Sequence, residues 1–151
     1  MVFGGANAIN LDTKGRLAMP RRYRDELQAQ CEGKLIVTVD RARCLLVYPQ
    51  PEWDRVVSKL TALPSLEEQA RNLQRMMLGY ATECTMDSNG RILLTPPLRV
   101  FAGLDKRVML VGQGTKFELW DERTWNELCE QWVAVGEKGG PLSVELESLS
   151  L

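Results

Sequence analysis

A short phrase occurs twice in this chain. The segment DTKGRL at 12–17 returns as DSNGRI at 87–92, an offset of 75 positions. The register continues beyond the phrase, because Trp53 is matched by Trp125 at an offset of 72 positions. A repeat of this length is a folding unit rather than one turn of a short solenoid. We therefore expect two copies of one fold, each presenting the same loop, and a ligand that is itself repeated.

The two copies share one order of predicted elements: strand, loop, strand, helix, strand, strand, helix. Alternating or β-branched segments predict strands at 9–11, 17–19, 35–39 and 44–48 in copy one, and at 108–111 and 116–120 in copy two. Gly15 supplies the positive φ that the first loop requires. Residues 21–27 then form a short helix with Tyr23 and Leu27 on its buried side. In copy two, Thr95 is the expected N-cap and Pro96 the first helical residue.

An insert separates the copies. Residues 51–63 are expected to form a helix that ends at Pro64, and residues 65–68 (SLEE) have the form of a capping box that starts a second helix. Gly79 stands where a C-cap would lie. The second helix has one apolar stripe, whose core-facing members are Leu66, Ala70, Leu73, Met77 and Tyr80. We interpret the insert as a helical hairpin that links the two copies.

A last helix is predicted after Asp121, which can cap it. Its apolar stripe recurs at helical spacing and consists of Trp125, Leu128, Cys129, Trp132 and Val133. This stripe favours packing within the chain, and a contact between subunits stays open as the alternative. Residues 136–141 break the helix, and the acidic tail to Leu151 is expected to be a loose end or a brief helix.

The chain has no histidine, which excludes Ser-His-Asp and Cys-His relays and imidazole metal ligands. The four cysteines have no metal-ligand spacing and are expected to be reduced and buried. Residues 112–116 (GQGTK) lack the spacing of a phosphate loop and predict a hairpin turn. We therefore expect no enzyme, no cofactor, no metal and no small-molecule substrate. The chain has no leader and no long apolar run, which predicts a cytoplasmic protein without a membrane partner.

Charge is distributed unevenly along the chain. The formal net charge is only -1, but residues 10–24 carry five basic residues against Asp12 alone. Residues 117–151 carry eight acidic residues against Arg123 and Lys138. One part of the molecule should therefore attract phosphate while another part repels it.

The repeated loop is the strongest functional signal. A hairpin turn explains the aspartate, which caps loop amides, and the glycine, which takes the unusual φ. It does not explain an arginine in both copies, since arginine is a planar donor suited to phosphate and to guanine edges. The candidate DNA-binding residues are Lys14, Arg16, Arg21, Arg22 and Arg91. Arg24 and Arg99 repeat at a helix position, which favours a structural role. From the residues alone, a solvated charged loop stays open as an alternative.

Four segments in order resemble the MraZ family: 10–17, 47–53, 86–91 and 116–121. The resemblance covers residues 3 to about 133. It implies an α+β fold of two tandem swapped-hairpin, SpoVT-AbrB-like β-barrel repeats that form a pseudo-dimer within one chain. The implied units are repeat 1 at 7–54, a helical linker at 55–81, repeat 2 at 82–128, and a helix end with an acidic tail at 129–151. The family's basic loop positions correspond to Lys14 and Arg16.

The resemblance further implies a nucleoid-associated repressor that assembles as a homo-oligomeric ring. Such a ring would bind short repeats in double-stranded promoter DNA and repress its own division and cell-wall gene cluster. Copy two departs from copy one, since Asn89 replaces Lys14 and residues 95–97 (TPP) replace residues 20–22 (PRR). The second loop is therefore expected to keep its turn and to bind DNA more weakly. The alternative function is a non-DNA, oligomeric, protein-binding adaptor that uses Trp125 and Trp132.

Overall fold

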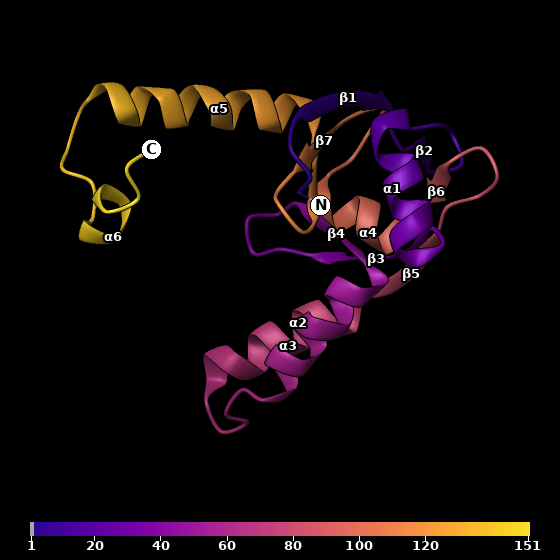
Figure 1. Ribbon diagram of the computed structural model, residues 1–151, viewed down its shortest axis with the longest axis horizontal. Helices are drawn as coiled ribbons and strands as arrows, with labels where there is room; N and C mark the ends of the chain where they lie inside the picture. The colour runs from indigo at the N-terminus through magenta and orange to yellow at the C-terminus, as the bar shows by residue number, and fades with distance from the viewer. Residues whose placement is uncertain (1) are drawn as a thin grey trace.

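The computed structural model describes residues 2–151 and shows an α+β protein made of two copies of one unit (Figure 1). The elements of copy one are β1 (Ala6–Asn10), β2 (Arg16–Ala18), α1 (Arg21–Cys31), β3 (Lys34–Val39), β4 (Leu45–Pro49) and α2 (Gln50–Thr61). Helix α3 (Glu68–Tyr80) leads to copy two, which contains β5 (Thr82–Thr85), β6 (Arg91–Leu93), α4 (Pro96–Ala102), β7 (Arg107–Gly112), β8 (Phe117–Asp121) and α5 (Glu122–Glu137). A short α6 (Val144–Glu147) follows.

The two copies exchange their first hairpins. Strand β1 of copy one pairs with β7 of copy two, and β5 of copy two pairs with β3 of copy one. The six-stranded sheet has the order β1-β7-β8-β4-β3-β5. The equivalent strands of the two copies are β1 and β5, β3 and β7, and β4 and β8. Replacing each strand by its equivalent simply reverses the order. Strands β2 and β6 form a separate two-stranded ladder. This symmetry confirms the swapped-hairpin pseudo-dimer expected from the family resemblance.

The strands do not close into a hydrogen-bonded barrel, which corrects the barrel expected above. β1 and β5 remain the two edges of the six-stranded sheet, and the β2–β6 ladder shares no strand with it. The reason is the shortness of β2 and β6, which are three residues long and pair only with each other.

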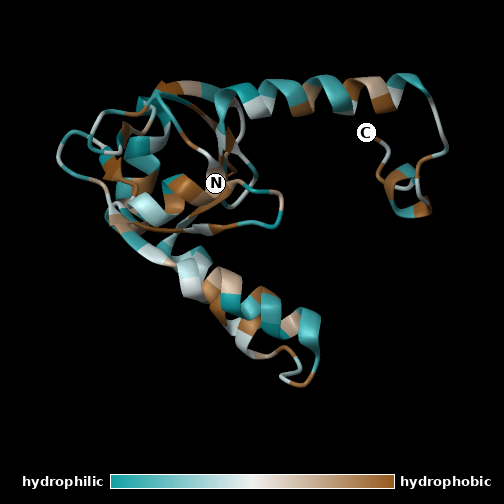
Figure 2. Ribbon diagram, turned by 180° about the vertical axis from the view of Figure 1, so that it is seen from behind, coloured by the Kyte–Doolittle hydropathy of each residue, from teal (hydrophilic) through white to brown (hydrophobic). Residues whose placement is uncertain are grey.

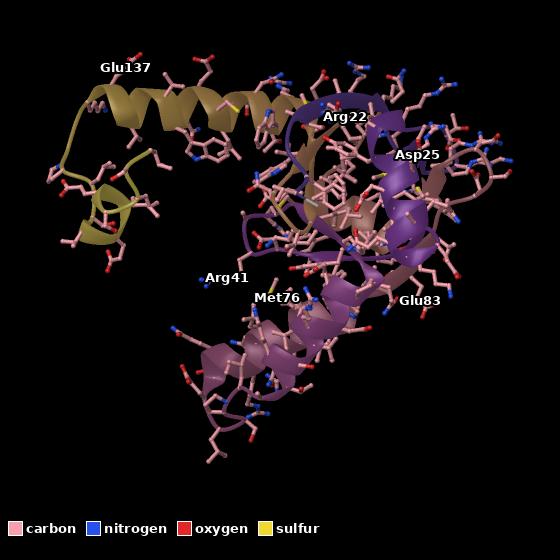
Figure 3. All side chains as sticks on the ribbon, in the orientation of Figure 1. Arg22, Asp25, Arg41, Met76, Glu83 and Glu137 are labelled. Carbon is pink, nitrogen blue, oxygen red and sulfur yellow. The ribbon has the colours of Figure 1, made fainter. Side chains whose placement is uncertain are left out.

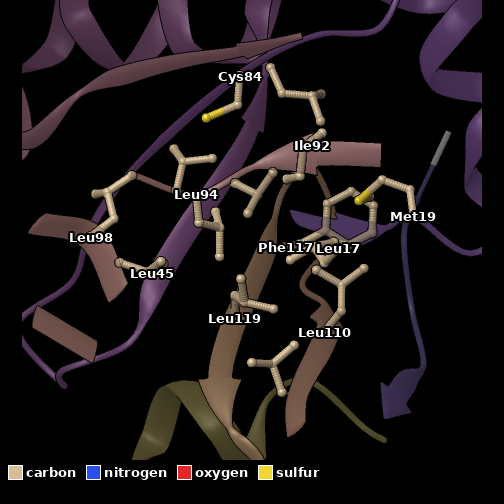
Figure 4. Close-up of a cluster of buried hydrophobic side chains, with 14 of the residues drawn as sticks. Leu17, Met19, Leu45, Cys84, Ile92, Leu94, Leu98, Leu110, Phe117 and Leu119 are labelled. Carbon is tan, nitrogen blue, oxygen red and sulfur yellow. The ribbon is translucent and has the colours of Figure 1, made fainter. Parts of the chain in front are cut away.

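The main core lies where the β2–β6 ladder covers the six-stranded sheet. Leu17 and Ile92 face each other across the ladder and are both 1% exposed. They meet Leu110, Phe117 and Leu119 of copy two, as the close-up in Figure 4 shows. Full burial of one such side chain stabilises the fold by roughly 1.5–3 kcal/mol. Because side chains alternate along a strand, the residues beside Leu17 and Ile92 must face outward.

Helix α1 begins at Arg21 as expected, but it continues to Cys31, four residues further than predicted. Tyr23 and Leu27 are buried, as their spacing indicated. Helix α4 has Thr95 at its N-cap position, although the threonine side chain makes no capping hydrogen bond. The α4 helix is shorter than α1, although both end at a residue in the left-handed conformation, Gly103 in α4 and Glu32 in α1.

Helix α2, the last element of copy one, and the linking helix α3 form a helical hairpin that projects from the body (Figure 1). Gln74 of α3 donates to the Leu60 carbonyl at 2.6 Å, and this hydrogen bond ties the two helices together. The capping-box prediction is wrong. Residues 64–67 form a turn closed by the Glu67 amide and the Pro64 carbonyl, so α3 begins only at Glu68. Leu66 is consequently 97% exposed.

The expected C-cap in α3 is also misplaced. Gly79 lies inside the helix, which continues to Tyr80 and is capped by Ala81. The helix continues because its end is fixed by tertiary contacts. Thr38, fully buried in β3, donates to the Met77 carbonyl at 2.6 Å, and Tyr80 packs against Phe101.

Helix α5 starts at the predicted cap, where Asp121 accepts hydrogen bonds from the amide and the hydroxyl of Thr124 at 3.1 Å. Its apolar stripe divides into two parts. Trp125 and Leu128 pack on the sheet beside Trp120 and Val111. The outer part of α5 extends away from the body and carries hydrophobic colour in Figure 2. There Trp132 is 52% and Val133 58% exposed.

The GQGTK segment forms the turn between β7 and β8, as predicted. Phe3 pairs with Gly114 through two backbone hydrogen bonds, at 2.8 and 2.9 Å. A side chain at Gly112 would collide with the backbone of Phe3 and Gly4, so glycine is required there. Within residues 2–151, none of the helices combines the length and the apolar character needed to span a membrane.

Candidate nucleic-acid interface

The first repeated loop is a turn organised by Asp12. One carboxylate oxygen of Asp12 accepts from the amides of Lys14 at 2.9 Å and Arg16 at 2.8 Å. Gly15 has φ +87°, which makes the turn possible. The other oxygen of Asp12 accepts from the Arg16 Nε at 3.0 Å. Hydrogen bonds from the backbone amides, above all that of Arg16, lower the pKa of Asp12, so this residue is ionised near neutral pH.

The second loop repeats this geometry around Asp87. Its carboxylate accepts from the amides of Asn89 at 2.8 Å and Arg91 at 3.0 Å, and Gly90 has φ +73°. The backbone hydrogen bond from Arg91 is the main cause of the lowered pKa of Asp87. The Arg91 Nε lies 3.5 Å from Asp87, and this buried nitrogen has no hydrogen-bond partner within residues 2–151. Arg91 is therefore held less firmly than Arg16.

The β2–β6 ladder brings the two arginines onto one surface. Arg16 lies opposite Leu93, and Ala18 lies opposite Arg91. Since Leu17 and Ile92 face the core, these four residues face outward, and we call them the ribbon face. The side chains of Arg16 and Arg91 are 34% and 36% exposed. The positive charge of Arg16 also contributes to lowering the pKa of Asp87, so the two loops act on each other electrostatically.

Arg24 and Arg99 each pack against the loop glycine of the other copy, while each donates to a backbone carbonyl of its own copy. The Arg24 Nε donates to the Met19 carbonyl at 2.6 Å, and a side chain at Gly90 would collide with Arg24. The Arg99 Nε donates to the Leu94 carbonyl at 3.1 Å, and a side chain at Gly15 would collide with Arg99. These contacts confirm the structural interpretation of the repeated arginines.

The remaining predicted site residues are distributed differently. Lys14 lies exposed beside Arg16 on the first loop. Arg21 is exposed at the start of α1, just after β2, and makes no ion pair within the described part of the chain. Arg22 lies toward β1 (Figure 3), where it donates to Asn7 at 2.9 Å and stacks over the Tyr23 ring at 4.7 Å. Lys14, Arg16 and Arg91 thus gather at the ribbon face, whereas Arg22 is engaged to one side.

Two features of the site were missed from sequence. The i, i+4 spacing of Asp12 and Arg16 indicated their ion pair. From the sequence, however, Asp12 was assigned only to capping the loop and Arg16 only to binding DNA. Leu93 was not considered, although it is 50% exposed on the ribbon face. Its exposure could have been predicted from strand alternation, since Ile92 and Leu94 on either side are buried.

This arrangement can bind a phosphate group or the acceptor edge of a guanine base. Asp12 occupies the Nε of Arg16, and neither terminal nitrogen of Arg16 donates to another group within residues 2–151. The free nitrogens form the fork that recognises phosphate oxygens or the O6 and N7 atoms of guanine. Among residues 2–151 no group of three or more histidine, cysteine or acidic residues could hold a metal ion.

Comparison with known proteins identifies the family. Residues 2–76 and 77–135 match the family described as "MraZ protein, putative antitoxin-like". The chain is 58% identical over 150 residues to "Transcriptional regulator MraZ" of Thioalkalivibrio sulfidiphilus (strain HL-EbGR7), with 99% of this chain and 100% of the relative covered. The chain belongs to the MraZ family. Proteins of the same name from Pseudomonas aeruginosa (strain LESB58) and Halorhodospira halophila (strain DSM 244 / SL1) are 55% and 50% identical over the same shares of the two chains.

Membership of the MraZ family gives the coarse function, which is regulation of transcription. The family match also divides the chain into two consecutive segments, in agreement with the two copies seen in the fold.

Proposed function

We propose that this MraZ protein is a sequence-specific DNA-binding regulator whose ribbon face and first loop contact double-stranded DNA. Lys14, Arg16 and Arg91 are the central contacting residues, and Arg21 and Arg22 at the start of α1 are the flanking ones. The observation that carries the proposal is the geometry of Arg16, whose Nε is bound by Asp12 while its terminal nitrogens stay free at the surface. Holding an arginine in this way fixes the direction of its donor fork before DNA arrives, which reduces the entropic cost of binding.

The two ends of the molecule differ in charge, which favours one orientation on DNA. The basic first loop and the β2–β6 ladder lie on one side of the body, while α5 and the acidic tail extend on the other (Figure 1). Glu137 marks the outer end of α5 in Figure 3. This polarity allows a chain of net charge -1 to approach phosphate with its basic side.

The finer function is repression of the protein's own division and cell-wall gene cluster through short promoter repeats. We propose that the protein assembles as a homo-oligomeric ring in which each subunit presents one first loop. Several weak contacts on a row of repeats then act together, and this avidity can raise affinity by about 10²–10⁴-fold when the spacing fits. The lower charge of the second loop, where Asn89 replaces Lys14, makes the first loop the stronger contact.

A salt titration of binding to the chain's own upstream DNA tests this function. Lys14→Ala should weaken binding uniformly and reduce the slope of log affinity against log salt by about one, as expected for one lost phosphate contact. Arg16→Ala should weaken specific binding by roughly 5- to 150-fold, because a bidentate base contact is worth about 1–3 kcal/mol. Arg123→Ala is the control, since this arginine is 88% exposed on α5, away from the ribbon face.

Wild-type affinity and slope in both loop variants would contradict the proposal. The same result would remove Lys14 and Arg16 from the interface. Loss of binding by Arg123→Ala equal to that of Arg16→Ala would show that only net charge matters, not the loop.

A protein-binding adaptor is the second candidate, because Trp132 and Val133 are exposed on the outer part of α5. Exposed aromatic residues of this kind are common at the centres of protein interfaces. A gel shift with upstream DNA at low salt separates the two functions. Absence of a shift, together with a stable complex with another protein that Trp132→Ala abolishes, would favour the adaptor.

A further inference from the structure

The ribbon face carries one large apolar side chain, Leu93, that does not pack into the hydrophobic core. Leu93 is 50% exposed, while Ile92 and Leu94 beside it are 1% and 0% exposed. Leu93 belongs to none of the three hydrophobic clusters of the described chain. A half-exposed leucine between charged loops contributes little to stability, since only part of its surface leaves water.

The two copies differ at this position. Leu93 is the equivalent of Ala18 at the repeat offset of 75 positions, and each lies opposite the arginine of the other copy. Leu93 stands opposite Arg16, and Ala18 stands opposite Arg91. The larger apolar side chain is therefore placed beside the arginine that is held more firmly by its aspartate.

We infer that Leu93 contacts the methyl group of a thymine in the DNA major groove, next to a guanine bound by Arg16. This inference rests on the proposed DNA-binding function and adds a base preference to it. The major groove admits a two-stranded β-ribbon and displays both the guanine O6 and N7 atoms and the thymine methyl group. Arginine matches the first pair of atoms, and an apolar side chain matches the methyl group.

The spacing of the ribbon sets how far apart the two bases lie. Side chains directly opposite each other on paired antiparallel strands have Cβ atoms about 4.5–5.5 Å apart. Successive bases on one DNA strand rise about 3.4 Å. Leu93 and Arg16 therefore reach bases one or two steps apart. The smaller Ala18 reaches less far, so the Arg91 end of the ribbon makes the weaker methyl contact.

The test compares thymine with deoxyuridine, which lacks only the C5 methyl group, at each thymine of the upstream DNA fragment. Wild-type protein should bind roughly fourfold more weakly when one particular thymine, close to a guanine, is replaced, which is the effect of losing one buried methyl group. Leu93→Ala should bind both versions of that fragment equally. Because Leu93 is half exposed, this variant should keep its fold, and circular dichroism checks that it does.

Leu66→Ala is the matched control, since Leu66 is 97% exposed at the tip of the α2–α3 hairpin, far from the ribbon face (Figure 1). It should retain the wild-type sensitivity to the methyl group. Equal binding of wild-type protein to all versions, or the same methyl sensitivity in Leu93→Ala, would overturn the inference while leaving DNA binding intact. Absence of any DNA binding by wild-type protein would overturn the proposed function as well.

Discussion

The exchange of hairpins predicts an energetic coupling between Arg24 in copy one and Gly90 in copy two. Gly90 has φ +73°, and an added Cβ would collide with the Arg24 side chain. Gly90→Ala therefore has two costs: about 1–2 kcal/mol for a left-handed alanine, and the loss of the Arg24 hydrogen bond to Met19. A hydrogen bond to a charged group is worth about 1.5–3 kcal/mol. The single substitution should destabilise the fold by about 2.5–5 kcal/mol.

Arg24→Ala alone should cost about 1.5–3 kcal/mol, because it removes the same hydrogen bond. In the double variant the bond is already absent, so Gly90→Ala adds only the backbone cost of about 1–2 kcal/mol. The destabilisations of the two single variants should therefore add up to about 1.5–3 kcal/mol more than the destabilisation of the double variant. This difference is a coupling in the range found for contacting residues. Urea unfolding at a single protein concentration measures all four proteins.

The pseudo-symmetry supplies the control for this cycle. Arg99 contacts Gly15 and not Gly90, so Arg99→Ala combined with Gly90→Ala should be additive within about 0.5 kcal/mol. Additive energies in the Arg24 and Gly90 pair, or equal coupling in the crossed pair, would refute the reasoning that each arginine supports the loop of the opposite copy.

Two further predictions concern pH and thiol reactivity. The pKa values of Asp12 and Asp87 are lowered on folding, so their contribution to stability is present above the unfolded value of about 3.9 and is lost as pH falls through the folded values. Acid unfolding followed by circular dichroism should thus be less steep for Asp12→Asn/Asp87→Asn than for wild type, and identical slopes would contradict this. Burial raises the pKa of Cys84 to about 11 and also raises that of Cys44, so iodoacetamide at mildly alkaline pH should modify Cys129 well before either. Mass spectrometry of the digested protein measures the order, and equal rates at all three thiols would contradict it.

Much of the fold follows from local patterns in the sequence. The β3–β4 and β7–β8 hairpins, the burial of Tyr23 and Leu27, and the Asp121 cap were all predicted from spacing and residue type. These features depend on short-range geometry, which alternation and capping rules describe well. The exchange of hairpins was expected only from family resemblance, because pairing of β1 with β7 joins segments about a hundred residues apart.

Local patterns did not show how far the tertiary structure would alter or limit each element. Residues 65–68 have a capping-box sequence, yet α3 begins at Glu68 because the chain forms a turn after Pro64. The stripe on α5 has uniform spacing, but only its first part reaches the sheet, so Trp132 stays exposed. Helical periodicity shows which residues share a face and does not show how far the neighbouring surface extends.

The candidate site was predicted in part. The turn roles of Asp12 and Gly15 were expected, and the structure confirms them. The gathering of Arg16, Arg91 and Leu93 on one face could not be predicted from either copy alone, because it depends on the pairing of β2 with β6.

The central claim is that the first loop contacts DNA more strongly than its copy. A photo-crosslinking amino acid placed at Thr13 or at Ser88, which are equivalent exposed positions of the two loops, tests this directly with labelled upstream DNA. The account predicts efficient crosslinking from position 13 and clearly weaker crosslinking from position 88. Stronger crosslinking from position 88, or none from position 13, would contradict it.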